Sequence, residues 1–163
     1  MHSSLIVTLI GPDRPGLVRA VAVCARQAGA NWVESRMAQL AGQFAGIVRL
    51  EIAPEKVTLL ENGLRSLETE GLRITVEHGL EGPEAAPQRV RLDLLGHDRP
   101  GIVQEITAVL LRHGVTIEEL ETGCERASMS GERMFRASAD LGVPAGTDLH
   151  LLQDDLEALA NEL

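Results

Sequence analysis

The chain has 163 residues, of which 44% are hydrophobic, and it carries 15 Lys and Arg against 24 Asp and Glu, a formal net charge of −9. An acidic chain with two Phe, one Trp and no Tyr lacks the basic and stacking surfaces of a nucleic-acid binder, so we expect no direct contact with nucleic acid. Its two Cys and five His are scattered, and no apolar run reaches the length of a membrane span. We therefore expect a soluble, cytoplasmic protein with no metal, no cofactor and no membrane partner.

The first half of the chain has the pattern of six elements in the order βαββαβ. Residues 5–10 show the short apolar run of a half-buried strand. Pro15 is expected in the first helical turn, and Gly29 is expected to end that helix. Strands are predicted over 31–40 and 44–52 around a short Gly turn, followed by a helix through the apolar positions 57, 60, 64 and 67 and a strand over 72–77.

The second half repeats this order. LIGPDRPGLV at 9–18 returns as LLGHDRPGIV at 94–103, and the same offset of 85 residues places Gly29 on Gly114 and Glu34 on Glu119. The repeat predicts a strand over 90–95, a helix that starts at Pro100, strands over 115–122 and 133–141 across the loop GCERASMSGE, and a helix over apolar positions 149–159. We expect the last strand of this second copy to be missing.

These elements define the predicted fold class and its domains. Two split β-α-β units that interleave give an antiparallel four-stranded sheet with two helices on one face. We therefore predict an α+β protein of two ferredoxin-like modules in tandem. The first module spans 1–78 and the second 89–163, and the Gly- and Pro-rich segment 79–88 is the predicted linker.

The repeated phrase has a possible chemical use at the corner between strand and helix. A helix N-terminus exposes unpaired N–H groups that attract a carboxylate. Pro15 has no N–H, so such contacts would come from Gly16 and Leu17, and the Asp13 carboxylate could accept a hydrogen bond from an ammonium group. A loop of this kind could hold both ends of a small zwitterion.

A simpler interpretation fits the same residues. An Asp a short way before a Pro is also typical of a helix cap, and Arg14 could pair with a neighbouring acid. Spacing alone leaves both interpretations open.

The order of elements, DRPG after the first strand and the segment GANWVESRMAQLAGQFAGIVRL at 29–50 together resemble the ACT domain family of small-molecule regulatory modules. Residues 31–48 are the more specific part of this match, because DRPG occurs in many ACT subfamilies. A tandem pair that covers the whole chain is similar to the family of glycine cleavage system transcriptional repressors.

The resemblance implies which residues contact an amino-acid ligand. In amino-acid-binding members the contacts come from the loop after strand one and from an Asn that opens strand two. With the helix N-termini included, the ligand-binding candidates are Gly11, Pro12, Asp13, Arg14, Gly16, Leu17 and Asn31 in the first copy and Gly96, His97, Asp98, Arg99, Gly101 and Thr116 in the second. Thr116 lacks the amide of Asn31, which makes the first copy the better equipped. His97 could bind a ligand as a neutral imidazole or simply be a solvent-exposed turn residue.

The resemblance also implies a function. ACT modules pair, here expected as a homodimer, and bind a small amino acid such as glycine at the interface between modules. The repressor family acts without reading DNA, by binding a transcription activator protein of the LysR type, and glycine weakens that complex. Two other functions stay open, a ligand-free interaction module and a regulatory subunit of an amino-acid metabolic enzyme. The two repeats account for both halves of the chain, and the sequence shows no arrangement of a nucleophile with a base or of metal ligands. We therefore expect no catalytic residue and no enzymatic activity.

Charge is divided unequally between the halves. Residues 1–82 carry eight Lys and Arg against nine Asp and Glu, whereas residues 83–163 carry seven against fifteen, which gives −1 and −8. An acidic half is typical of a solvated surface and is also compatible with a docking face for a basic partner.

Overall fold

The computed structural model describes residues 1–80 and 88–161. The chain divides into two compact units, Met1–Gly82 and Pro83–Leu163, referred to below as the first and second modules. Most of the predicted linker, residues 81–87, lies outside the described residues, as do residues 162–163.

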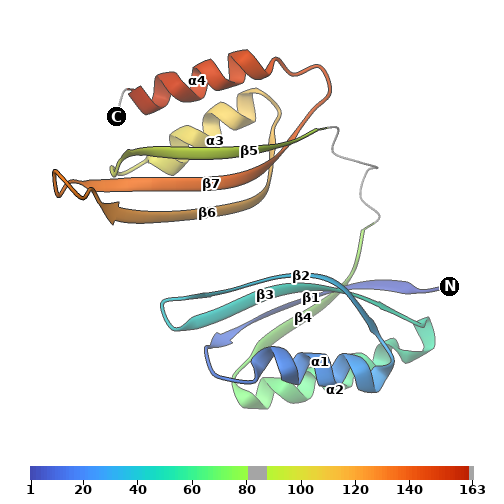
Figure 1. Cartoon of the computed structure of the whole chain (residues 1–163). Coiled ribbons are helices and arrows are strands. Elements are labelled where there is room, and N and C mark those ends of the chain that lie inside the picture. Colours follow the sequence, from blue (N-terminus) through green and yellow to red (C-terminus); the bar gives the residue numbers. More distant parts are fainter. Residues whose placement is uncertain (81–87, 162–163) are drawn as a thin grey trace. The chain divides into compact units, whose positions relative to one another are not determined.

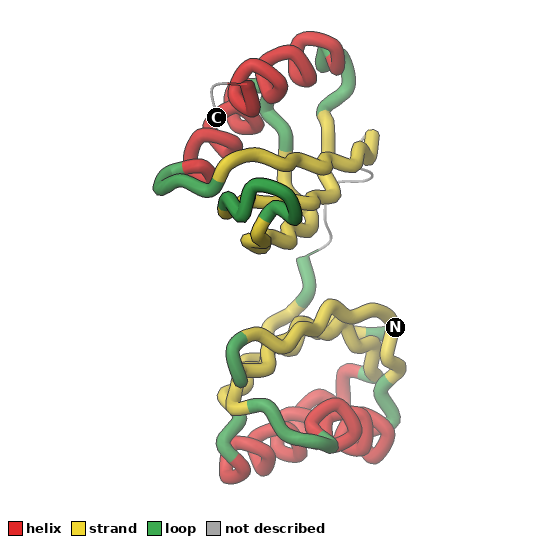
Figure 2. Tube along the Cα trace, turned by 60° about the vertical axis from the view of Figure 1, so that its left-hand side comes forward, coloured by secondary structure: helices red, strands yellow, loops and turns green. Residues whose placement is uncertain are grey.

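The first module has the predicted order of elements. It consists of β1 (Ser3–Pro12), α1 (Leu17–Ala28), β2 (Asn31–Leu40), β3 (Gln43–Ile52), the 3₁₀ turn η1 (Pro54–Lys56), α2 (Val57–Ser66), the 3₁₀ turn η2 (Leu67–Glu70) and β4 (Arg73–His78). Its four strands form one sheet in the order β2-β3-β1-β4, with every neighbouring pair antiparallel. Both helices lie on one face of this sheet, as the predicted fold class requires (Figures 1 and 2).

Alternation along the strands explains why the helices cover that face. Leu5, Val7 and Leu9 of β1 are all at most 2% exposed and face the helices, and Val21 of α1 packs into the same core. Between β2 and β3 the turn needs only two residues, Ala41 and Gly42, whose φ angles are 50° and 80°. Two consecutive positive φ angles are typical of the type I′ turn, whose twist matches that of an antiparallel hairpin.

The second module contains β5 (Gln88–His97), α3 (Ile102–Arg112), β6 (Thr116–Arg126), β7 (Arg133–Val143) and α4 (Leu149–Asn161). Its strands form an antiparallel sheet in the order β5-β7-β6, and α3 and α4 lie on one face of it (Figure 1). Among the described residues no strand pairs with the other edge of β5. None of the helices in 1–80 or 88–161 has the length and apolarity to span a bilayer.

Two details of the second module differ from or add to the sequence expectation. The loop GCERASMSGE was predicted to contain all five extra residues, but β6 continues to Arg126, because Cys124 and its neighbours stay paired with β7. The loop that remains, residues 127–132, is four residues longer than the two-residue turn of the first module, and each strand of the hairpin is longer by one residue. A break in register lies between Trp32 and Glu34 of β2 and again between Ile117 and Glu119 of β6, at the same offset of 85 residues. The duplication thus includes a β-bulge that no sequence pattern indicated.

Candidate functional site

The corner between β1 and α1 is held by backbone contacts to two neighbouring segments. The Asp13 N–H donates to the Gly42 carbonyl oxygen at 2.9 Å, which ties the corner to the β2–β3 turn. A Cβ added to Gly11 would lie 2.8 Å from the Gly71 carbonyl oxygen, so only glycine fits at this position. The loop between Gly11 and Leu17 is therefore a shaped part of the fold.

Each helix after the repeated phrase begins at a glycine in the left-handed region. Gly16 has φ 90° and Gly101 has φ 88°, and neither helix start has a side-chain capping hydrogen bond. Pro15 and Pro100 were predicted in the first helical turn, but both precede the helices, because a left-handed N-cap reverses the chain after them. The interpretation of Asp13 and Asp98 as helix caps is likewise wrong, since the glycine occupies that position.

The two arginines of the phrase are engaged by carboxylates, which confirms the ion-pair interpretation of Arg14. Arg14 Nη2 donates to Glu70 Oε2 at 2.5 Å, and Arg99 binds Glu105 through two hydrogen bonds, one of them 2.7 Å between Nη1 and Oε1. The hydrogen bond from Arg99 lowers the pKa of the Glu105 carboxyl from its ordinary value. In both modules the guanidinium group is oriented by a protein carboxylate.

The aspartates of the two corners have different surroundings. Asp98 Oδ2 lies 2.8 Å from Arg133 Nε, and its N–H donates to the Arg133 carbonyl oxygen at 3.0 Å. Beside it, His97 Nδ1 lies 3.6 Å from Glu132 Oε2, and half of the His97 side chain is exposed. Within residues 1–80 and 88–161, no side chain forms a hydrogen bond or ion pair with the Asp13 carboxylate, which is exposed. The first corner thus offers an open acceptor, whereas the second is already paired.

The two strand-opening candidates lie far from these corners. Asn31 pairs with Glu51, at the end of β3 opposite to Gln43, which pairs with Pro12. Eight residues of strand separate the two pairs, which is about 26 Å at roughly 3.3 Å per residue. A single module therefore does not bring Asn31 and Asp13 to one small ligand.

The same separation is repeated in the second module. Thr116 pairs with Gly142, and His97 pairs with Met134, eight residues away along β7. Thr116 Oγ1 donates to the Gly142 carbonyl oxygen at 3.3 Å, so this hydroxyl is engaged within its own module.

A second feature was not found from the sequence. A groove of ≈570 Å³ lies between β5 and α4, lined by residues 90–95, Leu141 and one face of α4, and none of the candidate residues lines it. The repeat could have located this groove, because the part of the second module in residues 88–161 has no strand that corresponds to β4, and part of the apolar face of α4 is left open there.

Comparison with known proteins identifies the family to which the two modules belong. The family model described as ACT domain matches residues 3–77 and 88–163. The chain is 27% identical over 161 residues to the glycine cleavage system transcriptional repressor of Escherichia coli (strain K12), which covers 98% of this chain and 85% of that protein. The repressor of Shigella flexneri matches to the same extent.

Two solved structures resemble the whole chain. One is an unknown protein from Galdieria sulphuraria, with TM-score 0.88, 29% identity and coverage of 99% of this chain and 94% of that one. The other, proposed to be a glycine cleavage system transcriptional repressor, has TM-score 0.71, 22% identity and coverage of 99% and 92%, which supports the fold alone. From the matched ranges and the two βαββα units it follows that this chain belongs to the ACT domain family, with one ACT module in each half.

Proposed function

We propose that this chain is a non-enzymatic regulator whose first ACT module binds a small amino acid, glycine or one of similar size, and which controls a LysR-type transcription activator of glycine cleavage genes by protein contact. The similarity to the Escherichia coli repressor along nearly the whole chain supports the regulatory role. A cytoplasmic location belongs to the same proposal, because the activator works on DNA there.

The observation that carries amino-acid binding is the open Asp13 carboxylate beside a glycine-capped helix start. An ammonium group can donate to Asp13, while the first-turn N–H groups of α1 that follow Gly16 suit a carboxylate. No acidic residue stands in the first turn of α1 to compete for those N–H groups, whereas α3 has Glu105 there. The first corner is therefore the better site for a zwitterion.

The position of Asn31 supports a homodimer. Because Asn31 and Asp13 lie at opposite ends of β3, a ligand that uses both needs a second copy of the chain to supply one of them. We propose a two-fold dimer in which each ligand contacts Asp13 of one copy and Asn31 of the other.

Isothermal titration of the intact protein with glycine, alanine and serine tests ligand binding. We expect saturable binding of at least one of them, and glycine at a hundredfold of its Kd should stabilise the fold by about 2.7 kcal/mol. Asp13→Ala should abolish this effect and the matched Asp98→Ala should retain it, because Asp98 is already paired with Arg133. If none of the twenty amino acids raises the melting temperature, the ligand part of the proposal is wrong.

The hydrogen bonds and ion pairs within the second module favour a role other than ligand binding. Asp98, Arg99 and Thr116 all have partners within that module, which leaves little for a ligand to replace. We propose that the second module serves protein interaction and not ligand binding. Co-purification of the activator with the wild-type chain, weakened by added glycine, tests the regulatory mechanism as a whole.

A further inference from the structure

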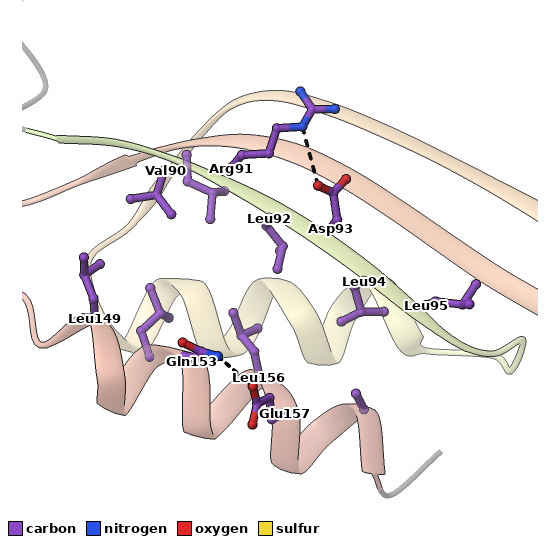
Figure 3. Close-up of a pocket in the computed structure, with 13 residues that line it drawn as sticks. Val90, Arg91, Leu92, Asp93, Leu94, Leu95, Leu149, Gln153, Leu156 and Glu157 are labelled. Carbon is purple, nitrogen blue, oxygen red and sulfur yellow. Dashed lines mark hydrogen bonds and ion pairs between the residues drawn. The ribbon is translucent and has the colours of Figure 1, made fainter.

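The outer edge of β5 is the place where the two modules differ most. In the first module, residues 5–10 of β1 pair with residues 73–78 of β4. The repeat offset of 85 places residues 90–95 of β5 at the same positions, and all six of them line the groove between β5 and α4. Figure 3 shows Leu92 and Leu94 on the side of the helices and Arg91 and Asp93 on the other face.

The helix side of the groove corresponds at an offset of 92 residues, which places the buried Leu60, Leu64 and Leu67 on the buried Leu152, Leu156 and Leu159. In the first module, Ile74 and Val76 of β4 lie against three residues of α2 and one of η2, with a gap of only ≈120 Å³: Glu61, Leu64, Arg65 and Glu68. The residues 92 positions later are Gln153, Leu156, Glu157 and Ala160, and all four line the groove of ≈570 Å³. The groove therefore occupies the place that β4 fills in the first module.

The side chains of β5 are also more exposed than those of β1. Leu5 and Val7 of β1 are 1% and 0% exposed. Their counterparts Val90 and Leu92 are only partly buried, although they pack against the same kind of core. An apolar strand edge left in this state is a site for strand addition.

The width of the groove fits one strand and excludes the edge of a second copy. Helices pack about 8–10 Å apart and strands about 4.7–4.9 Å apart, so two helices cover about four strands. The three strands that residues 88–161 place under α3 and α4 leave room for one more. If β5 of a second copy paired with this β5, the α4 helices of both copies would have to occupy the same space over the two paired strands.

Charge indicates the chemistry of that strand. On the outer face Arg91 is shared between Asp93, 3.7 Å away, and Asp140, 3.2 Å away, which leaves a net negative charge at the edge. On the helix side Glu157 stands where the first module has Arg65. In the register of the first module, the residue opposite Asp93 corresponds to Thr75. A basic side chain at that position would project from the outer face beside Asp93 and be attracted to its carboxylate.

We propose that the groove accepts an extended segment of a partner protein, which adds to β5 as an antiparallel fourth strand with apolar side chains opposite Leu92 and Leu94 and a Lys or Arg opposite Asp93. The inference rests on the proposed function only in assigning the segment to a protein partner, and it requires no bound amino acid. The partner segment should therefore have the alternating sequence pattern apolar–basic–apolar.

The test uses the full-length chain and a labelled peptide with the β4 sequence of residues 72–79 carrying Thr75→Lys. Fluorescence anisotropy should show saturable binding. Amide exchange measured by NMR should slow at those of residues 90–95 whose N–H groups point away from β7, but not in β1 or β6. Asp93→Lys should weaken binding about 3- to 10-fold, and a peptide with Thr75→Glu should recover it on that variant. Glu121→Lys is the matched control, because Glu121 pairs with Ser138 in the same row of the sheet on the opposite edge strand and should leave binding unchanged.

Three results would overturn the proposal. The first is absence of saturable binding, and the second is equal binding of a peptide in which the same residues are reordered so that apolar positions no longer alternate. The third is slow exchange, in the free protein, of those amides of residues 90–95 whose N–H groups point away from β7. Slow exchange there would mean that other residues of this chain or a second copy already cover β5, and sedimentation would separate those two cases. Because no glycine is added, failure here leaves the amino-acid proposal intact, and failure of glycine binding leaves this one intact.

Discussion

Single residues decide how the two corners can function. Gly16 and Gly101 adopt nearly the same left-handed conformation, so the two loops share a backbone, yet only Asp98 is paired with an arginine. The difference comes from Arg133, a residue of β7 that is remote in the sequence. An exposed, unpaired carboxylate keeps its capacity to accept hydrogen bonds, and this is why the first corner is the better candidate.

Cys24 allows a prediction of pH dependence. Burial, together with the nearby Glu70 carboxylate, raises the pKa of the Cys24 thiol above its ordinary value of 9.0. The folded chain therefore keeps this proton where the unfolded chain has lost it, so the free energy of unfolding should fall as the pH rises through 9.0. Cys24→Ala should remove that part of the alkaline loss.

Urea unfolding followed by Trp32 fluorescence at about pH 8 and about pH 10 measures this effect. Trp32 is a suitable probe because it is the only Trp and packs against the first core. Cys124→Ser, at an exposed position of β6, is the control variant. An alkaline loss of the same size in Cys24→Ala and the wild type would contradict the prediction.

At the scale of elements, the presence or absence of one strand changes how tightly the rest packs. β4 covers the edge of β1 and brings Ile74 and Val76 onto the first core. The described part of the second module has no counterpart, and Leu92 is left partly exposed. Side chains at equivalent positions should therefore contribute unequally to stability.

Truncation of one leucine on the helix side of β1 and one on the helix side of β5 tests this inequality, although Leu92 corresponds in the repeat to Val7 and not to Leu5. Leu5→Ala should destabilise the first module by about 3 kcal/mol, since it empties a fully packed site. Leu92→Ala should cost the second module only about 1 kcal/mol, because that side chain loses less burial. Amide exchange under native conditions reports each module separately, and equal losses in the two modules would show that the edge of β5 is covered.

At the scale of the whole molecule, the candidate site depends on assembly. The eight strand residues between the Asp13 and Asn31 ends of β3 mean that no single module unites them. Binding and dimerisation should therefore be linked, and glycine should favour the dimer.

Mixing two inactive variants tests this linkage. Asp13→Ala and Asn31→Ala should each abolish glycine binding, but a mixed dimer contains one complete site. After subunit exchange, titration should recover about a quarter of the wild-type binding capacity, since half of the dimers are mixed and each has one of two sites. No recovery in a mixture shown to exchange would mean that Asp13 and Asn31 do not act together across copies.

The sequence by itself determined most of the architecture. The offset of 85 residues and the alternation of strands 5–10 and 90–95 predicted the shared order of strands and helices in the two halves and the hairpin in each, because these depend on local patterns of two and 3.6 residues. It also located both corners. It placed Pro15 and Pro100 wrongly inside the helices, since the left-handed glycine that starts each helix is a backbone choice that composition does not reveal.

The tertiary structure decided what those corners and edges can do. That Asp98 meets Arg133, that Asn31 lies at the far end of β3, and that residues 90–95 and one face of α4 enclose a groove are all contacts between segments distant in sequence. Pairing register and helix packing set such distances, and both are properties of the whole module. The duplication gave the chain two copies of the same strand-to-helix sequence, and the tertiary structure placed different residues around each copy.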